Sequence, residues 1–171
     1  MNATPKLEFS GVKLGFMNTV VRPATLNDVG LIERWGRALY EVERVFEPHL
    51  RYLGEHYREQ DMERLLSPDA LYLIAEVQTQ PVGYLKASVV DVPGHLASSG
   101  RKCTIEVVYV EAFARGKGVA GELLETCFAW TREKSVKRVE AGVYAGNKAS
   151  LKLFKRFDLQ PHHVTVLKTF D

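Results

Sequence analysis

The stretch of this sequence that is best suited to chemistry is a basic, glycine-containing segment at residues 115–118, which reads Arg-Gly-Lys-Gly. Residues 104–110 before it are mostly β-branched or apolar and predict a buried strand. After it, apolar residues recur at helical spacing from Val119 onward. A helix's first turn carries unpartnered N–H groups, glycine lets an anion approach closely, and Arg115 and Lys117 add cationic donors. The segment therefore predicts a pyrophosphate-binding turn.

The same segment matches neither of two familiar nucleotide-binding motifs in full. A Walker motif ends in Gly-Lys-Ser/Thr, whereas here Gly118 is followed by Val119. Gly121 fits the third position of a Rossmann motif, but no acidic residue suits the ribose-binding role. The alternative to a phosphate site is a strand-to-helix turn with a basic, solvated tip.

Together with three other segments, the turn resembles the GNAT superfamily of N-acetyltransferases. Residues 115–120 fit the family signature Arg/Gln-x-x-Gly-x-Gly/Ala, and Val110 lies where the family ends its central strand. The other segments follow in family order: 20–25 with Asp28 as the first strand and helix start, 80–84 as a hairpin, and 147–157 as a late, Asn-led helix. The resemblance covers residues 18–170.

This resemblance implies that acetyl-CoA is the co-substrate and that no metal takes part. In the family, the pyrophosphate lies on the glycine turn and the pantetheine arm pairs with the end of the central strand. An Asn on the late helix holds the arm; here Asn147 also suits the N-cap of its helix. The implied cofactor-binding residues are Val108, Tyr109, Val110, Arg115, Gly116, Lys117, Gly118, Val119, Ala120, Asn147 and Phe154.

The implied reaction is direct transfer of an acetyl group to an amine. An amine must be neutral to attack, and lysine-like amines have a pKa near 10, so a base is useful. Glu106 is the candidate, because alternation would place it with Val108 on one face of the strand, toward the substrate region. The alternative for Glu106 is an ion-paired structural carboxylate.

The sequence departs from the family at Phe154, where many members carry a Tyr that acts as general acid to the leaving thiolate. Tyr109 or Tyr144 can substitute, so the catalytic candidates are Glu106, Tyr109 and Tyr144. Two functions remain open. One is an N-acetyltransferase acting on a primary amine of a small molecule or peptide, and the other is a non-enzymatic acyl-CoA-binding or interaction module.

These residues need a scaffold, and the hydrophobic patterns predict one. The expected strands are 18–23, 71–77, 82–90, 104–110, 136–144 and 164–167, with helices over 25–46, 52–66, 119–134 and from Asn147. This order predicts an α/β (α+β) fold with a mixed sheet and helices on both faces. The resemblance implies a mostly antiparallel, GNAT-like sheet of about six to seven strands. We expect one domain over 1–171, with 1–17 as an extension or extra strand and 91–102 as a long loop.

Composition sets the remaining expectations. A chain of 171 residues that is 46% hydrophobic and 26% charged is typical of a globular protein. A net charge of +2 gives no reason to expect nucleic acid, and no apolar run predicts a membrane span or signal peptide. Two cysteines make no disulfide framework. We expect a cytoplasmic protein, with a homodimer as an open alternative to a monomer.

Overall fold

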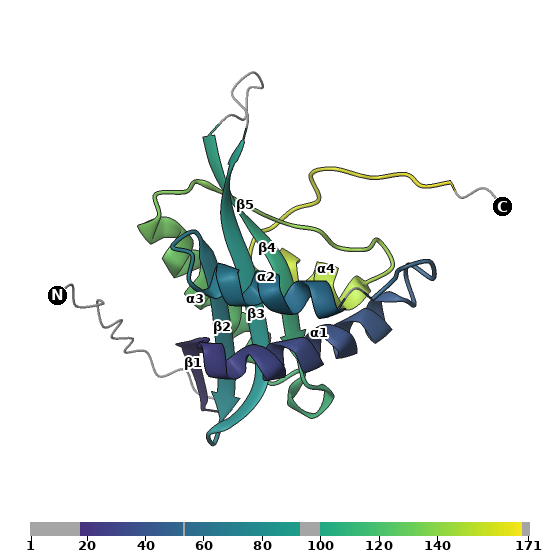
Figure 1. Ribbon diagram of the computed structural model, residues 1–171. Helices are drawn as coiled ribbons and strands as arrows, with labels where there is room; N and C mark the ends of the chain where they lie inside the picture. The colour runs from purple at the N-terminus through teal and green to yellow at the C-terminus, as the bar shows by residue number, and fades with distance from the viewer. Residues whose placement is uncertain (1–17, 53, 93–99, 169–171) are drawn as a thin grey trace.

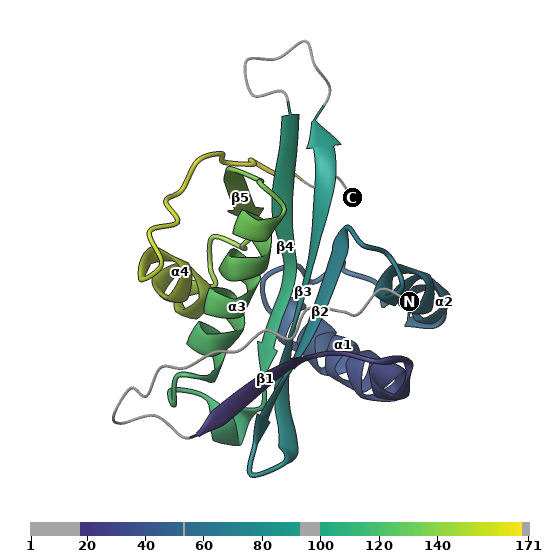
Figure 2. The same cartoon turned by 90° about the vertical axis from the view of Figure 1, so that its left-hand side faces the viewer.

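The computed structural model describes residues 18–52, 54–92 and 100–168 of the chain, which form a five-stranded sheet with helices on both faces (Figure 1, Figure 2). The strands are β1 Thr19–Pro23, β2 Ala70–Val77, β3 Gln80–Val92, β4 Gly100–Val110 and β5 Arg138–Ala141. They lie in sequence order; β1 to β4 are antiparallel, and β5 alone runs parallel to its neighbour β4. This arrangement confirms the predicted mixed, mostly antiparallel sheet.

The helices divide between the two faces of the sheet. Helices α1 (Val29–Glu43) and α2 (Gly54–Leu65) cover one face, while α3 (Val119–Glu133) and α4 (Lys148–Lys155) cover the other, as Figure 2 shows edge-on. In α1, the buried residues Val29, Ile32 and Trp35 recur every three positions and so share one side of the helix. No helix among the described residues is long and apolar enough to span a membrane.

Each face of the sheet carries its own hydrophobic core. On the α3 side, Leu123, Leu124 and Cys127 are fully buried against the sheet. On the α1 side the core is aromatic: the Trp35 ring stacks on Tyr84 at 5.6 Å between centroids and contacts Tyr109 at 6.0 Å. The Trp35 indole N–H donates to Glu111 at 2.7 Å, so the indole is both packed and hydrogen-bonded.

Three sequence-based expectations about the strands are wrong. Residues 164–167 form no strand in the described part of the chain; Val166 is 91% exposed and no strand lies beside it to form a ladder. The expected strand 136–144 is reduced to Arg138–Ala141, because the chain leaves β4 after Ala141. The expected loop 91–102 is partly strand, since Val92 pairs with Gly100.

Two further expectations, on the end of the first helix and on the number of strands, also differ from the structure. The helix expected to reach residue 46 ends at Glu43. The sheet has five strands rather than about six to seven. The extra strand considered for residues 1–17 lies outside the described residues.

An ion pair at the end of β1 ties that strand to the start of the first helix. The Arg22 guanidinium donates to both oxygens of Asp28 at 2.9 Å and to Glu76 of β2 at 2.8 Å. Asp28 also accepts from the backbone N–H of Thr25 at 2.7 Å. The hydrogen bonds from Arg22, despite partial burial, lower the pKa of Asp28 from 3.8 to about 2.

Arg22→Ala should therefore destabilise the protein by about 1–3 kcal/mol, because the buried carboxylate of Asp28 loses its charged partner. The pKa of Asp28 is depressed on folding, so this contribution is present above pH 3.8 and is lost as the pH falls toward about 2. Chemical denaturation at several pH values measures both effects. Arg44→Ala, which breaks an exposed pair with Glu41, should change stability by under about 0.5 kcal/mol. Equal losses of stability in the two variants would contradict the role of this ion pair. So would a difference in unfolding free energy between wild type and Arg22→Ala that does not shrink in acid.

Candidate active site

A glycine turn at the start of α3 is the first component of the site. After β4 and a short 3-10 turn, Ala112–Ala114, the backbone adopts positive φ angles of 74° at Gly116 and 91° at Gly118, the N-cap of α3. Residues with side chains rarely adopt such angles, which accounts for glycine at both positions. The Arg115 Nε donates to the Val110 carbonyl at 2.8 Å and so fixes the turn to the end of β4. The amides of Val119 and Ala120 precede the first intrahelical hydrogen bond of α3.

A cleft of about 450 Å³ opens beside this turn, between the end of β4, the first turn of α3 and α4. It collects most of the residues that the resemblance assigned to acetyl-CoA: Val108, Tyr109, Val110, Arg115, Gly116, Gly118, Val119, Ala120 and Asn147 line it. Two of the assigned residues do not line the cleft: Lys117, which is exposed on the turn, and Phe154. The combination of apolar walls and a cationic, amide-rich end suits an elongated ligand with an anionic terminus.

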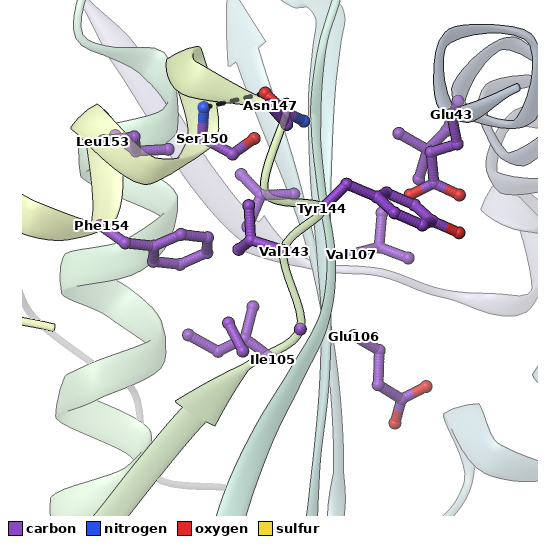
Figure 3. A pocket seen from close by; sticks show the side chains of 14 residues that line it. Glu43, Ile105, Glu106, Val107, Val143, Tyr144, Asn147, Ser150, Leu153 and Phe154 are labelled. Atoms are coloured by element: carbon purple, nitrogen blue, oxygen red, sulfur yellow. Dashed lines mark hydrogen bonds between the residues drawn. The ribbon is translucent and has the colours of Figure 1, made fainter. Parts of the chain in front are cut away.

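A second hollow of about 70 Å³ lies where β4 and β5 part (Figure 3). The parallel pairing ends at Ile105 opposite Ala141, and the chain beyond Ala141 then turns away from β4. The gap reaches through the sheet, because residues from α1 and from α4 both line it. It adjoins the cleft, since the two share the lining residues Leu39, Val108, Asn147, Ser150 and Leu153.

The position of Glu106 differs from the sequence-based expectation. The register between β3 and β4 shifts at Glu106, because Lys86 faces Val107 whereas Ala87 faces Ile105. Such a bulge leaves the extra residue unpaired and breaks the alternation of faces. Glu106 therefore lies on the α2 side of the sheet, where it contacts Arg64, whereas Val108 packs with the α3-side core. The expectation that Glu106 and Val108 share a face is wrong.

Three polar groups hold the Glu106 carboxylate. Arg64 of α2 donates to both of its oxygens, Ser88 donates at 2.7 Å, and the Lys86 ammonium lies 3.6 Å away. Burial alone would raise the pKa of Glu106, but the hydrogen bonds from Arg64 and Ser88 and the charge of Lys86 lower it. The ion-paired alternative for this residue is the arrangement observed.

A buried polar cluster beside Glu106 was not anticipated from the sequence. Lys86 donates to Asp61 at 2.7 Å, and Tyr72 donates to the same oxygen at 2.6 Å. Asp61 and Lys86 are only 7% and 8% exposed, so each charge is stabilised by the other. Lys86 sits in a strand of apolar residues and Asp61 in a polar helix, and no local pattern links the two.

The two candidate tyrosines occupy different places. Tyr144 lines the gap between β4 and β5, and burial together with the charges of Glu43 and Glu47 raises its pKa. Tyr109 lines the larger cleft, and its hydroxyl donates to Glu111 at 3.3 Å. Burial and Glu111 raise the pKa of Tyr109 as well. Of the two, Tyr144 is the one that faces the gap.

Helix α4 supplies the opposite wall of the gap. The Asn147 side chain accepts a hydrogen bond from the Ser150 backbone N–H at 3.1 Å, so Asn147 is the predicted N-cap of α4 (Figure 3). Phe154, two turns along, is 9% exposed and packs in the α3-side core with its ring toward the gap. The only carboxylate that reaches the gap from α1 in the described structure is Glu43. Glu43 lies four residues after Leu39, so the two side chains share one side of α1. This spacing is the sequence signal that could have identified Glu43 as a residue of the site.

Within residues 18–52, 54–92 and 100–168, no group of three His, Cys, Asp or Glu side chains could hold a metal ion. The sequence matches the model of the Acetyltransferase (GNAT) family over residues 36–159. No curated protein matches the chain.

Several solved structures share the fold. A predicted acetyltransferase with acetyl-CoA from Clostridium acetobutylicum superposes with a TM-score of 0.73 at 18% identity, covering 88% of this chain and 96% of that one. A GCN5-related N-acetyltransferase from Ralstonia eutropha gives 0.73 at 17%, covering 89% and 99%. The aminoglycoside N-acetyltransferase AAC(6')-Iy in complex with CoA gives 0.70 at 14%, covering 93% and 99%.

The close approach of β3 to the end of β4 gives a test of how the cleft is built. A Cβ on Gly83 would lie 2.6 Å from the Tyr109 carbonyl oxygen and 3.2 Å from the Val110 Cα. Gly83→Ala should therefore push the end of β4 outward and destabilise the protein by about 1–3 kcal/mol, measured by denaturant unfolding. In the control Gly30→Ala, the new Cβ meets no atom within 4 Å on α1, and helix propensity should stabilise by up to about 1 kcal/mol. A neutral Gly83→Ala would contradict the observed packing.

Proposed function

Because the chain belongs to the Acetyltransferase (GNAT) family, we propose that it transfers the acetyl group of acetyl-CoA to a primary amine of a small molecule or peptide. The observation that carries this proposal is the junction of two hollows. A cleft that begins at a cationic glycine turn leads into a gap between two parting strands. An elongated acyl carrier with a pyrophosphate at one end and a thioester at the other fits both.

The glycine turn is suited to the pyrophosphate. The amides of Val119 and Ala120 lie in the first turn of α3, where the helix dipole adds partial positive charge. The positive φ angles at Gly116 and Gly118 let the backbone approach an anion without a side chain in between. Arg115 and Lys117 on the same turn add positive charge.

The free edge of β4 is suited to the pantetheine arm. Beyond Ile105, no described strand pairs with the side of β4 that β5 leaves, while β3 still pairs with the other side up to Val110. An extended arm can add to such an edge through its amides, as a peptide does in β-augmentation. A backbone N–H of this edge can then polarise the thioester carbonyl in the manner of an oxyanion hole.

The chain's own side chains suggest how protons move. Tyr144 faces the gap, and its hydroxyl is protonated near neutral pH because its pKa is no lower than the ordinary tyrosine value, so we propose it as the proton donor to the leaving thiolate. Phe154, at the position where the resembled family often has Tyr, contributes an apolar wall instead. Glu106, the candidate base from the sequence, has both of its oxygens held by Arg64 and a lowered pKa, which disfavours it as the base.

A non-enzymatic acyl-CoA-binding module is the second candidate, and Phe154 is the observation that favours it. The two functions make the same prediction for binding but differ in turnover. Release of free thiol from acetyl-CoA, measured with a panel of amines, polyamines and peptides, distinguishes them. Thiol release that depends on amine supports the transferase, and tight binding without release supports the module.

Gly118→Asp should weaken acetyl-CoA binding by at least about tenfold, or 1.4 kcal/mol, in calorimetry. The variant places a carboxylate, on a residue with φ near 91°, where the pyrophosphate is expected. Gly100→Asp is the matched control, because Gly100 also has a positive φ of 124° and a Cβ there meets no atom within 4 Å. It should bind like the wild type. Unchanged affinity in a folded Gly118→Asp protein would remove the turn from the proposal.

A further inference from the structure

The carboxylate of Glu43 is placed where an amine acceptor would meet the acyl group. Glu43 is the last residue of α1 and reaches, together with Leu39, into the gap between β4 and β5. Figure 3 shows its carboxylate on the α1 side of the gap with the ring of Tyr144 beside it, and shows the Glu106 carboxylate apart from both. Arg64 of α2 holds the Glu106 carboxylate. Phe154 lies on the opposite side, so the gap has an acidic end and an apolar end.

The described residues around Glu43 supply no counter-charge. Within the described residues, no hydrogen bond or ion pair joins its carboxylate to another side chain, and partial burial raises its pKa. The titratable groups that face it are Tyr84 of β3 and Tyr144. Glu106 of β4 lines the same gap, and Glu47 acts on Tyr144 from the segment after α1. No Lys or Arg is among the described residues that line the gap.

An aromatic contact fixes this acidic end in place. The rings of Phe46 and Tyr144 stack at 5.9 Å between centroids, with 21° between their planes. Phe46 packs so closely on the backbone of Gly146 that a Cβ there would lie 2.9 Å from its ring. The segment after α1 is thereby tied to the loop that carries Tyr144, and the two walls of the gap are held together. An aromatic face next to a carboxylate favours the binding of a cation, because both attract positive charge.

We propose that Glu43 binds the acceptor as a cationic primary alkylamine and takes up the proton that this amine must lose. The inference rests on the proposed acetyltransferase function and names the acceptor's chemistry. A partly buried carboxylate that has no partner among the described residues gains most from an arriving ammonium group, because that group supplies its missing counter-charge. The Phe46–Tyr144 wall would line the path of the alkyl chain.

The proton and bond balance is complete with the groups named. The ammonium gives one proton to the Glu43 carboxylate, which later releases it to water, and the neutral nitrogen attacks the thioester carbonyl carbon. The C–N bond forms, the C–S bond breaks with its electron pair on sulfur, and the nitrogen loses its second proton to water; a proton that Tyr144 gives to the thiolate is replaced from water. The thiolate takes up one proton, from Tyr144 or water. The products are the acetamide, free coenzyme A and one proton released to solvent.

Glu43 suits this role better than Glu106 does. A base works best when its pKa lies toward the operating pH, and burial shifts the pKa of Glu43 in that direction. The pKa of Glu106 is shifted the opposite way, and Arg64 occupies both of its oxygens. Glu106 instead holds α2 against the sheet through Arg64, which is a positioning role.

The test compares Glu43→Gln with two matched carboxylate-to-amide variants, Glu106→Gln and Glu41→Gln. Glu41 lies on the same helix, is exposed and pairs with Arg44. Acetyl transfer is measured with 1,4-diaminobutane, a small amine, and with Nα-acetyl-lysine amide, a peptide-like amine. In Glu43→Gln, kcat/KM should fall about tenfold to a hundredfold near neutral pH. The loss should shrink as the pH approaches about 10, where the amine is already neutral.

Several outcomes decide the inference. Support is a loss in Glu43→Gln with unchanged acetyl-CoA affinity, partial recovery in Glu43→Asp, and wild-type behaviour in Glu41→Gln. If kcat/KM falls further with 1,4-diaminobutane, the acceptor is a small molecule; if it falls further with Nα-acetyl-lysine amide, the acceptor is a peptide. If Glu43→Gln keeps wild-type activity across pH while acetyl transfer is confirmed, the inference about Glu43 is overturned but the proposed function is not. A pH-dependent loss confined to Glu106→Gln assigns the base to Glu106. Wild-type protein that binds acetyl-CoA but acetylates neither amine overturns the proposed function together with the inference.

Discussion

The structure depends on one constraint, which is the short parallel pairing between β4 and β5. The two strands pair only from Lys102 opposite Arg138 to Ile105 opposite Ala141. Beyond that point β4 continues for five residues, still paired with β3, while the chain after β5 leaves the sheet. Backbone groups inside a sheet are normally paired, so a strand that continues past its neighbour presents an unused edge. The gap, the cleft and the position of α4 all follow from this parting.

Buried charges and close packing hold the parted sheet together on its α1 side. Trp35 bridges α1 to the end of β4 through Glu111, and Lys86 with Asp61 ties β3 to α2. Lys86 and Asp61 are buried, and an unpaired charge there would cost several kcal/mol. The two helices are therefore fixed against this face of the sheet, and the end of α1 reaches the gap. Glu43, the last residue of α1, is partly buried and lines the gap.

The sequence predicts local features of this protein well and relations between distant segments poorly. The glycine turn, the start of α3 and the N-cap at Asn147 were predicted, because each depends on residues within a few positions. The early end of β5 and the bulge at Glu106 were not, because they depend on the register between separate strands. Residues 164–167 have strand-like alternation but no strand beside them. The sequence does not distinguish Glu43 from the other charged residues of its helix, because its place in the site depends on the distant loop that carries Tyr144.

The most direct test of the central claim is hydrogen–deuterium exchange of the protein with and without coenzyme A. In the proposed complex, the ligand's arm lies along the free edge of β4 and its pyrophosphate on the first turn of α3. Coenzyme A should therefore slow exchange at the amides of residues 107–110 and 116–120, and leave the β1–β2 pair unchanged. Binding that protects other segments while the exchange of 107–110 stays as in the free protein would contradict the claim that the parted strands form the acyl site.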